Sequence, residues 1–416
     1  MMSHPEGPTP HEPPARRVFV HIGAPKTGTT FVQQVMWANR EHLAEDGILY
    51  PYTKRGEHLR ATLDLRERGW GDSSRRDFAG AWDTIAERAR DWPGHTVILG
   101  HEIMGGATEP QIRRLVRSLE PAQVHVIFTA RDIARQLTSD WQEHLKHRHT
   151  VTLEQFVGDL VELGHDAPKP FGEMFWGLHD APFILRRWAT VVPAERIHIV
   201  TVPQPGASGD TLWQRFCTVT GLDADRYDTD VQRTNRGLGI VEAELLRRVN
   251  RRLAQRRPRI PAMEYDQLVR LHLANRALAE RSDRIVLPPD SMPWALDKSR
   301  EMVTELRKGG YDVCGDLEEL IPRPEDHENF TARTDLTGDR LLPSAVLTIA
   351  ALLRIAARQK RQLRELRARL GELPPTAASF PSGSPGSGST ASGSLRGRLR
   401  AGGRRARSRL RRARAH

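Results

Sequence analysis

A short apolar run followed by a loop between two glycines constrains this chain more than any other stretch. The segment RVFVHIGAPKTGTTF (residues 17–31) starts with the β-branched and aromatic residues typical of a buried strand, which is expected to end at Gly23. From Thr29 onward, apolar residues recur at helical spacing, so the segment predicts a strand, a loop and a helix. The first N–H groups of a helix have no intrahelical partner and carry the positive end of its dipole. A tight loop at this point therefore favours a bound anion.

The loop also carries groups that suit a phosphate. Gly23 and Gly28 allow the backbone to come close, Lys26 adds a positive charge, and Thr29 and Thr30 add hydroxyls. In the nucleoside triphosphate loop GxxxxGK[ST] the lysine follows the second glycine, whereas here it precedes that glycine. The alternative interpretation is a simple glycine turn with a solvated lysine.

This order of residues resembles the 5′-phosphosulfate loop of sulfotransferases that use 3′-phosphoadenosine 5′-phosphosulfate (PAPS). In that family a KxGTT-type run wraps the 5′-phosphate, and its lysine approaches the oxygen that bridges phosphorus and sulfur. The resemblance implies that PAPS is the co-substrate and that five residues bind it: Lys26, Thr27, Gly28, Thr29 and Thr30.

A second pair of residues extends the resemblance. Arg131 follows the predicted strand VHVIFT, and Ser139 lies eight residues later, off the core face of the next predicted helix. The pair resembles the 3′-phosphate motif of the same family, although a salt bridge from Arg131 to a nearby acid is the alternative. In the family, a proline often follows this arginine and the acid after it, whereas here isoleucine follows them in the run RDI. The family's RKGxxG segment is absent from this chain. The nearest substitutes for that segment are Arg233, Asn235, Arg236 and Gly237.

Sulfuryl transfer needs a base for the acceptor's proton and a positive group for the leaving oxygen. Lys26 suits the second task. His101 ends the run TVILGH at a position similar to the family's histidine base, and Glu102 follows it. Other branches of the family use a glutamate after the first helix, where this chain has Glu57 and His58. The sequence ranks His101 first and leaves His58 and Glu102 open.

The predicted strands at 18–22, 97–99, 124–129 and 197–202, with a short strand or extended segment at 48–51, alternate with helices. They predict an α/β fold with a central parallel sheet flanked by helices in three layers, a P-loop-like arrangement. We expect residues 165–181 to be irregular. The expected organisation is a disordered N-terminus (1–16), an α/β domain (17–330) with a nucleotide-binding core (17–222) and a helical part (223–330), a basic helical extension (331–373), a Ser/Gly/Pro linker (374–394) and a disordered arginine-rich tail (395–416).

The positive charge of the chain is concentrated in its tail. Residues 395–416 contain ten arginines and no acid, and without them 53 Lys and Arg face 52 Asp and Glu. A nucleic-acid-binding body is therefore not expected, and no specific nucleic-acid partner is predicted. The two cysteines form no disulfide framework, so a cytoplasmic location is the default. The tail could also hold the protein peripherally at an anionic inner membrane surface.

Two features concern the helical extension and the metal content. Along the extension, a row of leucines and an alanine could pair with another helix: Leu352, Ala356, Leu363, Leu366 and Leu370. Its longest apolar run, near 345–357, is interrupted by Arg354, so no membrane span is expected. The sequence shows no acidic ligand pair beside the loop, so no metal is predicted.

The sequence thus predicts a PAPS-dependent sulfotransferase. Its acceptor would be a hydroxyl or amine of a carbohydrate, a lipid or a small molecule. Two other functions compete with this one. A P-loop kinase would need a lysine after Gly28 and an acid at a strand end for Mg²⁺, and a non-catalytic nucleotide-binding or assembly protein would act through the tail.

Overall fold

The computed structural model describes residues 16–231, 237–256, 258–278 and 282–369. The linker, the arginine-rich tail and all but the last residue of the predicted disordered N-terminus lie outside these ranges. The chain divides into two compact units, Met1–Gln359 and Lys360–His416. The first unit contains the sheet and all of the predicted site residues.

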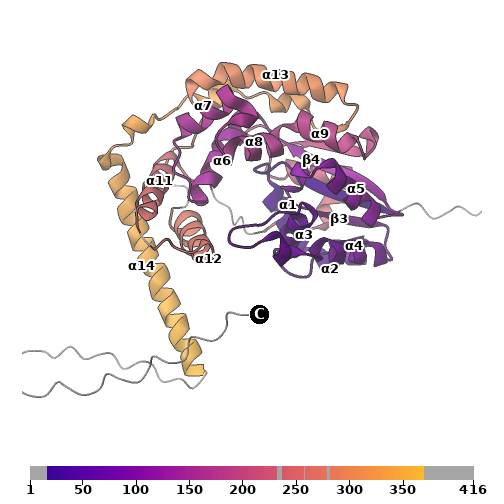
Figure 1. The fold of residues 1–416 in the computed structure, drawn as a ribbon, viewed down its shortest axis with the longest axis horizontal. Helices are drawn as coiled ribbons and strands as arrows, with labels where there is room; N and C mark the ends of the chain where they lie inside the picture. Colours follow the sequence, from indigo (N-terminus) through magenta and orange to yellow (C-terminus); the bar gives the residue numbers. More distant parts are fainter. Residues whose placement is uncertain (1–15, 232–236, 257, 279–281, 370–416) are drawn as a thin grey trace, which may run out of the picture. The chain divides into compact units, whose positions relative to one another are not determined.

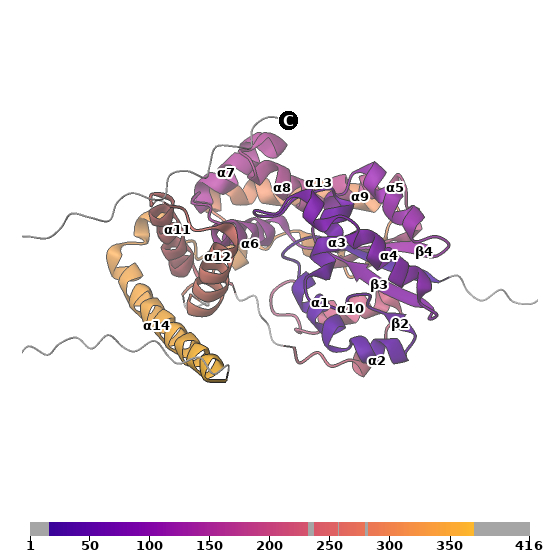
Figure 2. The ribbon, with the colours of Figure 1, turned by 60° about the horizontal axis from the view of Figure 1, so that its bottom comes forward.

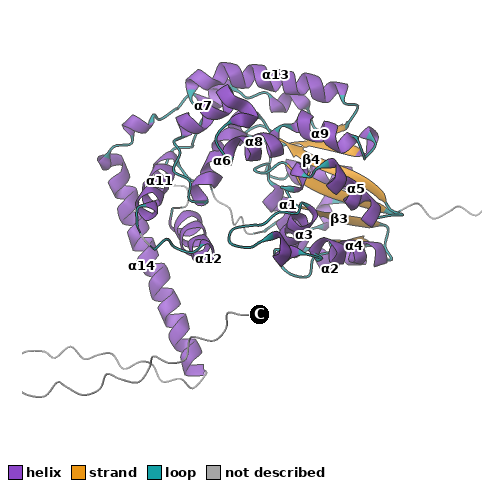
Figure 3. Ribbon diagram, viewed as in Figure 1, coloured by secondary structure: helices purple, strands orange, loops and turns teal. Residues whose placement is uncertain are grey.

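A parallel sheet forms the centre of the first unit (Figure 3). Its strand order is β2-β3-β1-β4-β5-β6, and every described pairing is parallel. The strands are β1 (Arg17–Gly23), β2 (Ile48–Leu49), β3 (Thr96–Gly100), β4 (Gln123–Ala130), β5 (Ile197–Thr201) and β6 (Asp312–Cys314). The predicted α/β class with a central parallel sheet flanked by helices is confirmed. The edge strand β6 is a strand that the sequence did not predict.

Helices cover both faces of the sheet, as a parallel sheet requires. In Figure 2, α1 (Thr29–Ala38), α2 (Arg40–Glu45) and α10 (Thr211–Thr220) lie on one side of the strands. On the other side lie α3 (Glu57–Leu65), α4 (Ala81–Asp91), α5 (Glu109–Ser118) and α9 (Ala181–Ala189). The central strands β1 and β4 are therefore buried almost throughout.

The remaining helices follow β4 and β5 in the chain (Figure 1). They are α6 (Ile133–Lys146), α7 (Leu153–Leu163), α8 (Phe171–His179), α11 (Ile240–Ala254), α12 (Ala262–Tyr265), the π-helix η6 (Asp266–Ala277), α13 (Met292–Lys308) and α14 (Gly338–Arg369). Helix α8 corrects the expectation of an irregular segment at 165–181. It forms because its residues Phe171, Phe175 and Trp176 are buried together against the core.

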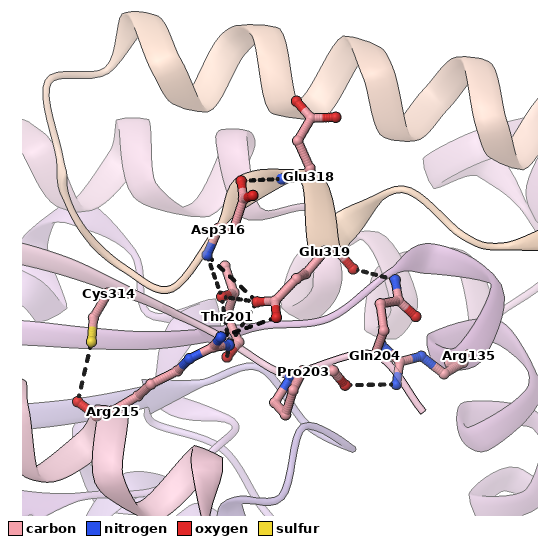
Figure 4. A network of polar contacts seen from close by, with 9 residues as sticks. All are labelled: Arg135, Thr201, Pro203, Gln204, Arg215, Cys314, Asp316, Glu318 and Glu319. Atoms are coloured by element: carbon pink, nitrogen blue, oxygen red, sulfur yellow. Dashed lines mark hydrogen bonds and ion pairs between the residues drawn. The ribbon is translucent and has the colours of Figure 1, made fainter. Parts of the chain in front are cut away.

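A polar network fixes the segment after β6 to the carboxyl end of β5 (Figure 4). Glu319 accepts two hydrogen bonds from Arg215 of α10, at 2.6 and 3.0 Å, and a third from the Thr201 hydroxyl at 2.5 Å. Gln204 donates to the Glu319 carbonyl at 2.6 Å. These contacts join β5, α10 and the segment after β6.

Candidate active site

The loop between β1 and α1 is built as tightly as its sequence predicts. Gly28 precedes α1 with φ of 88°, a left-handed conformation that favours glycine. A Cβ atom at this position would lie 2.4 Å from Cδ2 of Leu212 in α10. The Ala24 N–H donates to the Thr129 carbonyl at 2.9 Å, which ties the loop to β4. The positive φ and the close approach of Leu212 therefore both favour glycine at this position.

Thr27 holds the loop from inside. Its side chain is buried, and its Oγ1 donates to the Ala24 carbonyl at 2.6 Å and contacts the Thr129 hydroxyl. Thr129 in turn donates to the Gly23 carbonyl at 2.9 Å. The Thr27 side chain thus shapes the loop, so any contact of this residue with a ligand would come from its backbone.

Lys26 forms an ion pair with Glu143 of α6. Lys26 has φ of 63°, and both side chains are partly exposed, at 23% and 30%. Burial alone lowers the pKa of Lys26, but the negative charges of Glu143 and Glu102 outweigh it, so the pKa is raised. Burial raises the pKa of Glu143, but the charge of Lys26 and the hydrogen bond from His147 together outweigh it and hold this pKa well below its usual range. Both groups are therefore charged at neutral pH.

A second carboxylate meets the start of α1. Thr29, the first residue of the helix, donates its hydroxyl to the Glu102 carboxylate, which follows β3. Thr30 is the next residue of the helix and is half-buried. Carboxylates thus contact the lysine and one threonine of the predicted anion loop, and a bound phosphate would have to replace those contacts.

Arg131 joins the two predicted anion sites. Its Nη1 atom donates to the Lys26 carbonyl at 2.9 Å and to the Ser139 hydroxyl at 3.3 Å. Its Nε atom is buried and has no hydrogen-bond partner within the described residues. Burial lowers the pKa of Arg131 to about 10, and the charge of Arg135 adds to the decrease. The structure therefore places Lys26, Arg131 and Ser139 at one sheet edge.

His101 lies beside the same edge, directly after β3. Its Nδ1 atom accepts a hydrogen bond from the Ile103 N–H at 3.3 Å, which places the proton of a neutral ring on Nε2. Burial lowers the pKa of His101 to about 4, and the charge of Arg66 adds to the decrease. The ring is therefore neutral at physiological pH.

His58 stacks on His101, whereas Glu57 turns elsewhere. The two imidazole rings lie 5.0 Å apart between centroids, with an interplanar angle of 27°. Burial, followed by the charge of His101, lowers the pKa of His58 to about 4. Glu57 pairs with Arg88 at 3.0 Å and accepts from the Thr53 N–H at 2.7 Å. The structure groups His58, His101 and Glu102, and it uses Glu57 to hold the start of α3.

Sequence reasoning missed Glu143 as a partner of the loop lysine. The helix beginning after Arg131 was predicted, and Glu143 lies one turn beyond Ser139, so helical spacing could have placed both on one side. The predicted substitutes Arg233, Asn235 and Arg236 lie outside the described residues. Within the described ranges, no group of three or more His, Cys, Asp or Glu side chains could hold a metal ion.

A cavity of about 200 Å³ lies elsewhere in the first unit, with Arg148 and Tyr265 among its lining residues. None of the predicted site residues lines it. The candidate site is therefore defined by the side chains that converge on the loop and not by this cavity.

Comparison with known proteins gives little further information. No family model matches the chain, and no curated protein matches it. A solved structure of a sulfotransferase from Alicyclobacillus acidocaldarius is similar to part of it, with 16% identity over 52% of this chain and 85% of that one. The TM-score is 0.35, which is too low to support an argument about function.

Proposed function

We propose that this chain is a sulfotransferase that moves a sulfuryl group from PAPS to a hydroxyl or amine. The observation that carries the proposal is the position of Arg131, whose Nη1 atom bonds both to the loop at Lys26 and to Ser139. A nucleotide with phosphates at its 3′ and 5′ positions needs two anion sites at one sheet edge. The buried Nε of Arg131, which has no partner in the described part of the chain, supplies a donor that such a phosphate would satisfy.

The proposed roles follow from the position of each group. The first N–H groups of α1, with Lys26, Thr29 and Thr30, would hold the 5′-phosphosulfate, and Arg131 with Ser139 would hold the 3′-phosphate. Binding would exchange the carboxylate contacts of Glu143 and Glu102 for contacts to phosphate. The charge of Lys26 is then available for the leaving oxygen.

The reaction would form a bond from the acceptor oxygen or nitrogen to sulfur. The bond between sulfur and the bridging oxygen breaks, and its electron pair stays on the 5′-phosphate near Lys26. We assign the acceptor's proton to His101 at Nε2. This role requires the ring proton to move to Nδ1, with loss of the 3.3 Å bond from Ile103, which is long for a hydrogen bond.

The acceptor is proposed to be a carbohydrate, a lipid or a small molecule, and the site of action the cytoplasm. A screen of the purified full-length protein with labelled PAPS against these three acceptor classes identifies the substrate. Transfer of label to at least one class is expected.

The contact between Thr29 and Glu102 favours one second candidate. A strand-end carboxylate beside the hydroxyl of a phosphate loop is an arrangement that could hold Mg²⁺ with a nucleoside triphosphate. A P-loop kinase is therefore the competing function. Mg²⁺-dependent ATP turnover by the purified protein, without transfer from PAPS, would favour the kinase.

Calorimetric titration with PAPS tests the donor assignment. Lys26→Ala and Arg131→Ala are each expected to abolish detectable binding, because each removes a charge from a different anion site. Lys308→Ala and Arg117→Ala remove exposed charges elsewhere and serve as matched controls. Unchanged affinity in both site variants would reject the proposal.

A further inference from the structure

Helix α14 exposes its large apolar residues and buries polar ones, which is the reverse of an ordinary surface helix. Its buried residues are Leu341, Ser344 and Thr348, so two of the three are polar. Ser344 donates its hydroxyl to Glu242 of α11 at 2.9 Å, and Glu242 is itself buried. The helix is thus held to the rest of the first unit by this polar contact together with buried Leu341 and partly buried Leu352.

The opposite side of the helix is apolar and exposed. This outer face consists of Leu342, Val346, Leu347, Ile349 and Leu353, which are each between 55% and 66% exposed. At about 100° per residue, Leu342, Val346, Ile349 and Leu353 lie within about 60° of one another. Leu347 lies about 100° further round, and all five are on the side opposite the three buried residues. The spacing of these four residues alone would suit the narrow seam by which one helix pairs with another, and exposed Leu347 widens the face beyond that seam.

The composition of the helix also suits a lipid environment. Over 18 residues, α14 reaches a mean hydropathy of 1.6, and only 17% of that stretch is buried. By length and composition alone the helix could cross a membrane, although the sequence predicted no span. Its buried side is bonded to Glu242, however, so lipid cannot surround it while that contact persists. A position at the membrane surface satisfies both observations.

The basic residues that follow the outer face in the sequence indicate which kind of surface this face binds. Between Arg354 and Arg369 the chain has seven basic residues and one acid, and residues 395–416 add ten arginines and no acid. Anionic lipid headgroups complement this charge. A second copy of the chain would bring the same positive charges together, which opposes pairing through this helix.

We propose that the outer face of α14 binds the surface of an anionic lipid bilayer. The apolar side chains enter the boundary between headgroups and acyl chains, and the basic residues that follow contact the headgroups. The Ser344 side of the helix stays on the protein. This inference stands independently of the proposed sulfotransfer, because it uses none of the residues of the candidate active site.

Sedimentation of the full-length protein with vesicles tests the proposal. Binding is expected to vesicles of phosphatidylcholine with about one third phosphatidylserine, and at least ten-fold weaker binding to phosphatidylcholine alone. The double variant Val346→Glu with Leu353→Glu is expected to weaken binding to the mixed vesicles at least ten-fold. The matched control, Leu163→Glu with Met263→Glu, adds the same charges at exposed apolar positions outside α14 and should bind as the wild type does.

Circular dichroism and the thermal midpoint verify that both double variants are folded. Unchanged vesicle binding by the α14 variant would overturn the proposal, because the arginine tail alone would then explain the affinity. Absence of wild-type binding to the mixed vesicles would overturn it too. So would a dimer in light scattering that the α14 variant loses, since a second copy would then cover the face. Resistance of bound protein to alkaline carbonate would indicate a span and contradict a surface position.

Discussion

Helices α1 and α14 bury opposite kinds of residues. Helix α1 lies against the sheet and buries Val32, Val35 and Met36, as its helical spacing predicts. Helix α14 buries Ser344 and Thr348, and its row of large aliphatic residues is exposed. Where a helix covers the sheet, its apolar stripe therefore faces the protein's own core. Where the helix packs on a buried polar group, as α14 does on Glu242, its apolar stripe is exposed.

The largest effect is expected at the candidate active site, which α1 helps to form, when His101 is replaced. His101→Ala should lower kcat roughly 10²- to 10⁴-fold with little change in PAPS affinity, because the base acts on the acceptor and not on the nucleotide. His58→Ala should have a smaller effect, since this ring stacks on that of His101 and is not assigned the acceptor's proton. Steady-state kinetics with the acceptor found in the screen measures both. A larger loss in His58→Ala would move the base assignment to that residue.

On the α14 side, the polar contact can be broken directly. Ser344→Ala leaves an oxygen of buried Glu242 without its donor and is expected to lower the free energy of unfolding by about 1–3 kcal/mol. Urea denaturation measures the change. Ser73→Ala, at an exposed position, is the control. If Ser344→Ala unfolds as the wild type does, the contact does not hold α14 to the unit.

Stability should also depend on pH through the histidines near the site. Burial lowers the pKa of His21 and of His101 to about 4, whereas unfolded histidine titrates near 6.5. Between these values the unfolded chain binds more protons, so stability falls as the pH drops from about 6.5 to 4. The slope should reach about 1 kcal/mol per pH unit for each histidine. Urea denaturation across this range, with His21→Gln as comparison, measures it. An unchanged slope in the variant would contradict the burial of this ring.

The smallest effect is expected at Glu143. Glu143→Gln removes the carboxylate that pairs with Lys26, so PAPS should bind a few-fold more tightly than to the wild type. Calorimetry measures the change, with Glu87→Gln as an exposed control on α4. Weaker binding in Glu143→Gln would mean that the carboxylate positions Lys26 for the donor.

The nucleotide edge could be predicted because its pattern is local. The strand ending at Gly23, the turn at Gly28 and the helix starting at Thr29 follow from residues that are close in the chain. Strand β6 could not be predicted, because it has three residues that are exposed or half-buried and depends on pairing with β5. Helix α8 was missed because two glycines interrupt its pattern and prolines flank it, and burial of its aromatic rings decides its structure.

The ion pair of Lys26 and the side that α14 buries could not be predicted from local sequence, because both depend on the tertiary structure. Glu143 lies 117 residues after Lys26, so no local pattern joins them. On α14, the sequence predicted a pairing row that includes Leu352, Leu363 and Leu366. Leu352 packs partly against the core, whereas Leu363 and Leu366 are exposed. Whether an apolar side faces inward depends on the surface that the fold presents to it.

The most direct test of the central claim compares two nucleotides that differ by one phosphate. Calorimetry should show that the wild type binds adenosine 3′,5′-bisphosphate roughly 10- to 100-fold more tightly than adenosine 5′-monophosphate. Arg131→Ala should lose this preference and keep its affinity for the monophosphate. Equal affinity of the wild type for both nucleotides, or a full preference in Arg131→Ala, would contradict two anion sites that share one nucleotide.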